Sequence, residues 1–240
     1  MTDCAIVYTQ AADAVGAAQD LARQVSTAFG GGTPDALILF ASPRYEHAVL
    51  LETLDAALRP RALVGASSAG EFTGQARGDG ACAMALRSAD MKFTAGIGRG
   101  LSEDRAGAAR ALTKSFAGLA SNEYPYRSAL VMTDALAGHA DDVVDELTLA
   151  TSGKYQFFGG GAGDNANFQK TPVFFGTEAT TDAAVALEIL SKKPVGVGVG
   201  HGWEPATATS RALLKFGGDS SDSYATARAG ASTVFVSFDV

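Results

Sequence analysis

Short apolar runs alternate with amphipathic stretches along most of the chain. Residues 37–40 and 130–132 are apolar throughout, as strands covered on both faces are. Residues 45–58 place their apolar side chains on one helical face, and Arg59 and Pro60 then end the helix. The same periodicity predicts further helices over 11–29, 102–119 and 139–151. The pattern therefore predicts a mixed α/β fold whose sheets are flanked by helices.

The pattern occurs twice. Ala36–Phe40 resembles Ala129–Thr133 at a spacing of 93 residues (129 − 36), and the same spacing carries Ala69-Gly-Glu onto Ala162-Gly-Asp. Residues 96–101 resemble residues 198–203 at a spacing of 102 (198 − 96), so the second copy carries an insertion around 165–177. We predict an internal duplication into two strand–helix–strand half-domains, 1–119 and 120–205, related by a pseudo-two-fold axis.

Glycine alternates with apolar residues over 193–203. Val195, Val197 and Val199 share one face of the predicted strand, and glycines leave the other face bare. Residues 96–100 repeat the pattern more weakly. A bare glycine face indicates a close neighbour, and the sequence leaves open whether this is a ligand or a tightly packed helix. Arg99 and His201 hold equivalent positions at the two strand ends and are candidate ligand-binding groups.

Two loops of small residues, 64–72 and 157–165, each end in Ala-Gly-acid. Such loops expose backbone N–H groups that can hold an anion, whereas the alternative is a tight turn without a ligand. If the half-domains are symmetric, both loops meet at one cleft. The predicted ligand-binding residues are Ser67, Ser68, Gly70, Glu71, Arg99, Gly161, Gly163, Asp164, Asn165, His201 and Trp203.

Charge and cysteine content narrow the functional classes. The 240 residues carry a formal net charge of −7 with no basic run, which argues against nucleic-acid and anionic-membrane surfaces. Only Cys4 and Cys82 are present, so no disulfide framework is expected, and a reducing cytoplasm fits. We find neither a signal peptide nor an apolar run long enough for a membrane helix, and we expect a soluble cytoplasmic protein.

Four motifs in this order, at 37–40, 64–71, 158–164 and 195–203, resemble the FIST N domain. The resemblance implies a non-enzymatic sensory domain that binds a small ligand such as an amino acid. It also implies a signalling partner of the kinase, cyclic-dinucleotide enzyme or chemoreceptor type. Some members resemble haem-binding nitric-oxide sensors, an alternative that would place haem on His201; otherwise no cofactor is expected. Family members usually continue into a companion C-terminal domain. Here residues 206–240 form a Ser/Ala/Gly-rich tail with a terminal strand, so we expect that domain to be absent.

The second alternative is a serine hydrolase, because residues 65–69 come within one residue of the G-x-S-x-G elbow. That elbow needs a helix directly after the serine, and Gly70-Glu-Phe-Thr-Gly is a poor helix start. No nucleotide-binding fingerprint or zinc-ligand spacing is found. The preferred hypothesis places an amino acid between the halves. Loop N–H groups would hold its carboxylate, Glu71 or Asp164 its ammonium, and Trp203 would form an apolar wall.

Overall fold

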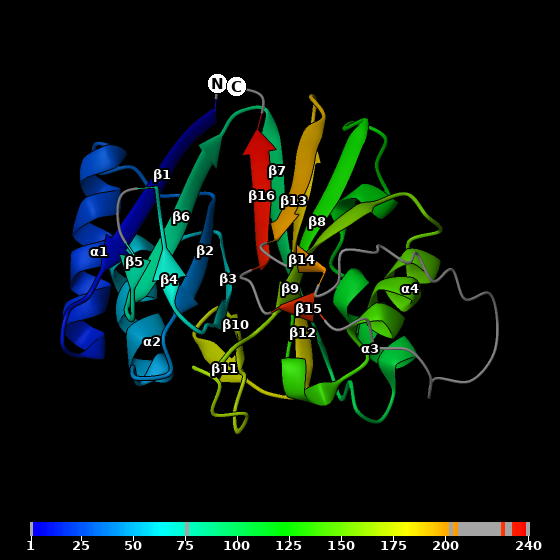
Figure 1. The fold of residues 1–240 in the computed structure, drawn as a ribbon. Helices are drawn as coiled ribbons and strands as arrows, with labels where there is room; N and C mark the ends of the chain where they lie inside the picture. The colour runs from blue at the N-terminus through cyan, green and yellow to red at the C-terminus, as the bar shows by residue number, and fades with distance from the viewer. Residues whose placement is uncertain (1, 75–76, 202–203, 206–226, 229–231, 239–240) are drawn as a thin grey trace. The chain divides into compact units, whose positions relative to one another are not determined.

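The computed structural model describes residues 2–74, 77–201, 204–205, 227–228 and 232–238 (Figure 1). The chain divides into two compact units, Met1–Pro194 and Val195–Asp239. In its described residues the first unit contains two main sheets, one separate pair of short strands and four α-helices, which confirms the predicted mixed α/β class with helices flanking the sheets.

The first sheet has six strands and is covered on one face by two helices. Only its β2–β3 pair is parallel. A hydrophobic core fills the space between this sheet and the helices, with Leu21, Leu39 and Leu54 fully buried. In order across the sheet the strands are β1 (Thr2–Thr9), β6 (Ala81–Ser88), β2 (Ala36–Ala41), β3 (Ala62–Ser67), β10 (Val173–Phe175) and β11 (Glu178–Thr180), and the helices are α1 (Ala14–Ala28) and α2 (His47–Leu58).

The second sheet has four strands and its own pair of helices. Its parallel pair is β8–β9, and Leu112 and Leu147 are buried in the core beneath the helices. The strands follow the order β7 (Met91–Arg99), β12 (Ala183–Ser191), β8 (Tyr126–Thr133) and β9 (Gln156–Gly161), and the helices are α3 (Arg105–Thr113) and α4 (Ala140–Ala150). The sheets meet where β3 and β10 contact β7 and β12.

Both sheets are built from the same succession of elements. The order β1-α1-β2-α2-β3-β6 is matched by β7-α3-β8-α4-β9-β12, and the strands pair in the same order. The chain passes from the first sheet to the second between Ser88 and Met91, which is earlier than residue 119. This common order is what the sequence repeat predicts; the duplication and the domain limits themselves stay predictions.

The pairing registers correct the uniform spacing of 93. Ala41 pairs with Ala81 and Ser67 in the first sheet, and Thr133 pairs with Ala184 and Gly161 in the second. Corresponding residues are therefore 92 apart in β2 and β8 (133 − 41) and 94 apart in β3 and β9 (161 − 67). A shift of one residue reverses the face to which a strand residue points, so this difference affects which side chains correspond.

The bare glycine face of β7 is covered by helix α3. A side-chain Cβ at Gly96 would lie 2.3 Å from the Leu112 carbonyl oxygen, and one at Gly98 would lie 2.1 Å from the Ala108 oxygen. Of the two alternatives for the glycine face of β7, this confirms a tightly packed helix and not a ligand. The helix begins later than residue 102, because the Asp104 carboxylate accepts a hydrogen bond from Gly107 N at 2.8 Å and caps it. It ends at Thr113 and is followed by the 3₁₀ helix η1 (Ala117–Leu119).

One hairpin of the second half joins the first sheet. Strands β10 and β11 lie in the chain between β9 and β12 of the second sheet, yet β10 pairs with β3. The corresponding strands of the first half, β4 (Glu71–Phe72) and β5 (Arg77–Gly78), pair only with each other. The insertion predicted around 165–177 therefore covers both the loop that leads into this exchanged hairpin and β10 itself.

The second unit contains two strand pairs. Strand β13 (Val195–His201) pairs antiparallel with β16 (Ser232–Phe238), where the terminal strand was predicted, and β14 (Glu204–Pro205) pairs with β15 (Ala227–Arg228). Trp203 and most of the predicted tail lie outside the described residues. Within the described part of the chain, no helix has the length and apolarity needed to cross a bilayer.

Candidate functional site

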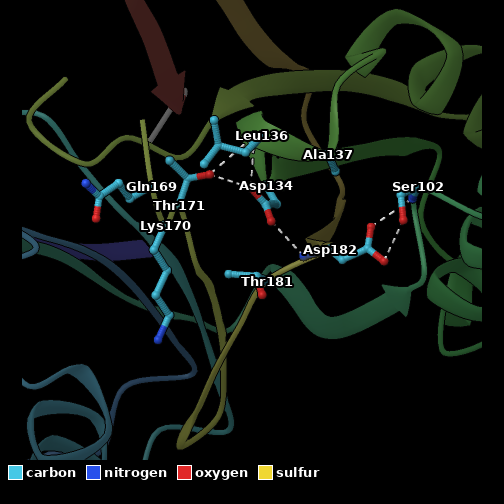
Figure 2. A pocket seen from close by; sticks show the side chains of 9 residues that line it. All are labelled: Ser102, Asp134, Leu136, Ala137, Gln169, Lys170, Thr171, Thr181 and Asp182. Atoms are coloured by element: carbon cyan, nitrogen blue, oxygen red, sulfur yellow. Dashed lines mark hydrogen bonds between the residues drawn. The ribbon is translucent and has the colours of Figure 1, made fainter. Parts of the chain in front are cut away.

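A pocket of about 460 Å³ opens at the carboxyl end of β8 (Figure 2). Its walls come from the turn after β7, the 3₁₀ helix η2 (Ala135–Ala137) after β8, the loop before β10 and the turn before β12. Carboxyl ends of parallel strands are the usual ligand position in α/β sheets. The lining residues are Ser102, Asp134, Leu136, Ala137, Gln169, Lys170, Thr171, Thr181 and Asp182.

Asp134 lies at the centre of this pocket and is only 6% exposed. Its Oδ1 accepts hydrogen bonds from Leu136 N at 3.0 Å and from the Thr171 hydroxyl, and its Oδ2 accepts one from Asp182 N at 2.6 Å. Among the residues that the structure describes, no cation forms an ion pair with it. Neutral donors alone therefore stabilise a carboxylate beside an open cavity.

Two further charged groups line the same pocket. Asp182 adopts a left-handed backbone with φ of 50°, and its carboxylate accepts hydrogen bonds from Ser102 N at 2.8 Å and Ser102 Oγ at 3.0 Å. Lys170 is exposed, and within the described residues its ammonium makes no ion pair. The carboxylates of Asp134 and Asp182 therefore lie in this pocket, whereas the Lys170 side chain points away from both of them (Figure 2).

Asp164 holds the loop that carries Gln169, Lys170 and Thr171. Its carboxylate accepts hydrogen bonds from Phe168 N at 2.9 Å, Gln169 N at 2.7 Å and Lys170 N at 3.1 Å. These backbone donors, led by Gln169 N, lower the pKa of the Asp164 carboxyl below its ordinary value. Asp164 therefore shapes a pocket wall and does not itself line the cavity.

The two Ala-Gly-acid loops lie against each other. Gly163 N donates to the Ser67 carbonyl at 2.8 Å, and a Cβ at Gly163 would lie 3.0 Å from Ala69 N. Glu71 is 3% exposed and accepts hydrogen bonds from Gly80 N at 2.6 Å and from the Ser68 hydroxyl. Burial raises the pKa of Glu71. The polar groups of the two loops are therefore bonded to other groups of the protein. The buried Ser67 hydroxyl is an exception, because it has no hydrogen-bond partner in the described structure.

The remaining predicted residues are dispersed. Arg99 forms an ion pair with Glu178 of β11 at 2.5 Å, and Asn165 Nδ2 donates to Asp79 at 3.4 Å. Gly70 has φ of 99° in the turn before β4, and Gly161 ends β9. His201 ends β13, and Trp203 lies outside the described residues, so the haem alternative on His201 stays a prediction.

Of the predicted residues whose side chains the structure describes, none lines the pocket, and the residues that do line it were missed. One signal was available: Asp134 follows directly after the apolar strand β8, where carboxyl-end ligand sites are expected. Asp182, Lys170 and Thr171 had no comparable signal, because the exchange of β10 and β11 between sheets brings them there.

The hydrolase alternative lacks its elbow. Strand β3 leads through residues 68–70 into strand β4, and no helix follows the serines. A nucleophile elbow requires a strand-to-helix turn. No group of three or more His, Cys, Asp or Glu residues in the described ranges is arranged to hold a metal ion.

The chain belongs to the FIST N domain family, whose model matches residues 35–213. The FIST N domain is a sensory domain of signal transduction proteins, which implies a small ligand and a signalling partner in general. A search of the curated proteins finds no match.

Among solved structures, a cyanuric acid hydrolase from A. caulinodans is 10% identical, with a TM-score of 0.34 over 85% of this chain and 72% of that chain. A second structure described as cyanuric acid hydrolase is 13% identical, with a TM-score of 0.36 over 84% of this chain and 72% of that chain. Similarity this distant carries no inference about activity.

Proposed function

We propose that this FIST N domain senses a small ligand that carries both an ammonium and a carboxylate, in the simplest case an amino acid. The observation that supports this proposal is the pocket after β8, which Asp134, Asp182 and Lys170 line. The flexible Lys170 side chain would turn toward a bound carboxylate. The volume of about 460 Å³ suits a small molecule. The ammonium of the ligand binds the acidic side, and its carboxylate binds Lys170.

The acceptor capacity of the two acids supports this assignment. A carboxylate offers about four lone-pair sites. Asp134 uses three of them and Asp182 uses two, so both can accept a further hydrogen bond from an ammonium. A lysine ammonium suits a carboxylate as a mobile point charge.

Binding without covalent chemistry is the simplest use of this pocket. Ser102 donates its hydroxyl to Asp182, and no histidine or cysteine occurs among the described lining residues. The serine therefore lacks the imidazole base that activates hydrolytic serines. Ligand binding instead shifts the population of conformations, and a signalling partner reads that shift.

A thermal-shift screen of the proteinogenic amino acids tests the proposal, because a ligand that binds only the folded state raises the Tm. Lys170→Gln and Asp182→Asn should each weaken binding about tenfold or more, because each removes a hydrogen bond between charged groups. Lys154→Gln is the matched control, since Lys154 is exposed and does not line the pocket. Equal binding by all three variants would overturn the site. A Soret band without amino-acid binding would favour the haem alternative.

A further inference from the structure

The β10–β11 hairpin connects the pocket to the first sheet. The chain enters the hairpin just after Thr171 and leaves it through Thr181 and Asp182, and all three residues line the pocket. Both chain segments beyond these points belong to the second sheet, through β9 and β12. The hairpin itself pairs with the first sheet. The pocket therefore lies where the exchanged hairpin leaves and rejoins its own half.

One carboxylate holds both ends of this hairpin. Asp134, at the end of β8, accepts hydrogen bonds from the Thr171 hydroxyl at one end and from Asp182 N at the other. Thr171 is 3% exposed, so its hydroxyl has little access to water as an alternative partner. These two bonds join the ends of the hairpin to the second sheet and to each other.

The hairpin is equally well attached to the first half. Phe174 is fully buried in the core beneath α1 and α2, and its ring centroid lies 4.9 Å from that of His47. Strand β10 pairs with Val64, Gly65 and Ala66 of β3, and Ser67 N donates to the Pro172 carbonyl at 2.9 Å. A change in how firmly the hairpin ends are held therefore reaches β3 and the loop after it.

We propose that the β10–β11 hairpin transmits occupancy of the pocket to the first sheet, with Asp134 as the positioning residue that sets how tightly the hairpin is held. A ligand that contacts Asp134, Lys170 and Asp182 binds both hairpin ends and suppresses their local opening. The ligand-dependent part of this mechanism rests on the proposed function. The mechanical link between Asp134, the hairpin and β3 does not.

Hydrogen exchange measured by mass spectrometry on the full chain tests the mechanical link without any ligand. Thr171→Val preserves the shape of the side chain and removes the hydroxyl donor to Asp134. Exchange over 173–180 and over 64–67 should become about tenfold faster, because opening of the hairpin exposes both partners of the β3–β10 pair. Thr171→Ser keeps a hydroxyl and should exchange like the parent. The control is Thr180→Val, since among the described residues the Thr180 hydroxyl donates to its neighbour, the Thr181 carbonyl, and not to Asp134.

Glycine is the probe for the ligand arm, because every other α-amino acid contains its two charged groups. Millimolar glycine should slow exchange over 173–180 and 64–67 in the parent. If glycine binds but slows exchange only at the pocket, and Thr171→Val leaves β3 unchanged, transmission is overturned while the proposed function stands. If Thr171→Val loosens both segments but no amino acid binds, the link stands and the proposed ligand class fails.

Discussion

Ser42 and Asp134 occupy the same position at the carboxyl ends of β2 and β8, and they mark the difference between the two halves. Ser42 N donates to the Gly80 carbonyl at 2.8 Å, as Asp134 N donates to the Ala183 carbonyl at 2.9 Å. Each side chain also accepts a hydrogen bond from the amide two residues ahead. The carboxylate reaches two further donors, Thr171 and Asp182 N, which the shorter hydroxyl does not.

The same backbone frame therefore ends beside a pocket after β8 and beside the loop acid Glu71 after β2. In the first half the Gly80 amide donates to Glu71, an acid from the loop after β3. In the second half the Asp182 amide donates to Asp134, and the carboxylate of the loop acid Asp164 accepts hydrogen bonds from the backbone of its own loop. A single acid at the end of β8 and the exchanged hairpin therefore distinguish the half that borders the pocket.

The largest change in the free energy of unfolding should come from Ser42→Asp, which gives the first half the acid of the second. Ser42 is fully buried, and Ser42→Asp would bury a carboxylate without the donors that surround Asp134. The free energy of unfolding should fall by about 3 kcal/mol at neutral pH, the cost of an uncompensated buried charge. Burial favours the protonated form, so the loss should shrink as the pH approaches the ordinary aspartate pKa of about 3.9. Urea denaturation at both pH values measures it.

Ser42→Ala is the control for this substitution, since it removes the hydrogen bond to Arg44 N without adding charge. Its cost should be about 1 kcal/mol and independent of pH. If Ser42→Asp were no more destabilising than Ser42→Ala, the first half could accommodate the carboxylate, and the contrast between the halves would lose its physical basis.

The sequence predicted the fold well because the signals for it are local. Apolar runs identified β2 and β8, helical faces identified all four helices, and the repeat indicated two similar halves. Residues 64–67 and 157–161, which we predicted as parts of loops, instead belong to β3 and β9, because small residues also fit a strand that is closely packed on its neighbours. The uniform spacing of 93 was one residue off in both strands of the parallel pair. That spacing made Thr133 equivalent to Phe40 and Asp134 equivalent to Ala41. The pairing registers instead make Asp134 equivalent to Ser42. Similar small apolar residues cannot distinguish such shifts.

The pocket could not be predicted because it depends on a non-local exchange. Nothing in residues 173–180 indicates that this hairpin pairs with β3 of the other half and leaves Thr171 and Asp182 beside Asp134. The glycine loops and Asp164 drew attention by composition, yet hydrogen bonds within and between the loops occupy most of their polar groups. Composition identified where the halves meet, but not which side chains line a cavity.

The reverse substitution, Asp134→Ser, gives the second half the residue of the first. It should lower the free energy of unfolding by a smaller amount and abolish the proposed ligand binding. Asp134→Ser retains an acceptor for Leu136 N, as Ser42 does for Arg44 N, and leaves Asp182 N and the Thr171 hydroxyl without theirs. The loss should be about 2 kcal/mol, because unsatisfied buried donors are costly. Urea denaturation measures this loss, and the thermal-shift screen should find no amino-acid binding. A stable variant that still binds would show that Asp134 is not what separates the halves.

The smallest expected effect is on the pH dependence of the free energy of unfolding, to which the loop acids Glu71 and Asp164 contribute in opposite directions. Burial raises the pKa of Glu71 in the folded state, so between its ordinary value of 4.5 and the higher folded value the folded protein holds more protons. The free energy of unfolding contributed by Glu71 therefore falls as the pH rises through that window. Backbone donors lower the pKa of Asp164 below its ordinary 3.8, so its contribution is present above that value and is lost as the pH falls through the folded pKa.

Glu71→Gln and Asp164→Asn separate these two contributions. In the parent protein, the free energy of unfolding should decline as the pH rises just above the ordinary glutamate pKa. Urea denaturation between about pH 3 and pH 7 should show that Glu71→Gln removes this decline. Asp164→Asn should remove a loss that lies below the ordinary aspartate pKa, and it should also weaken ligand binding because the loop bearing Lys170 is no longer held. If both variants changed the pH profile in the same direction, the two loops would have the same electrostatic environment, and only the Ser42–Asp134 position would distinguish the halves.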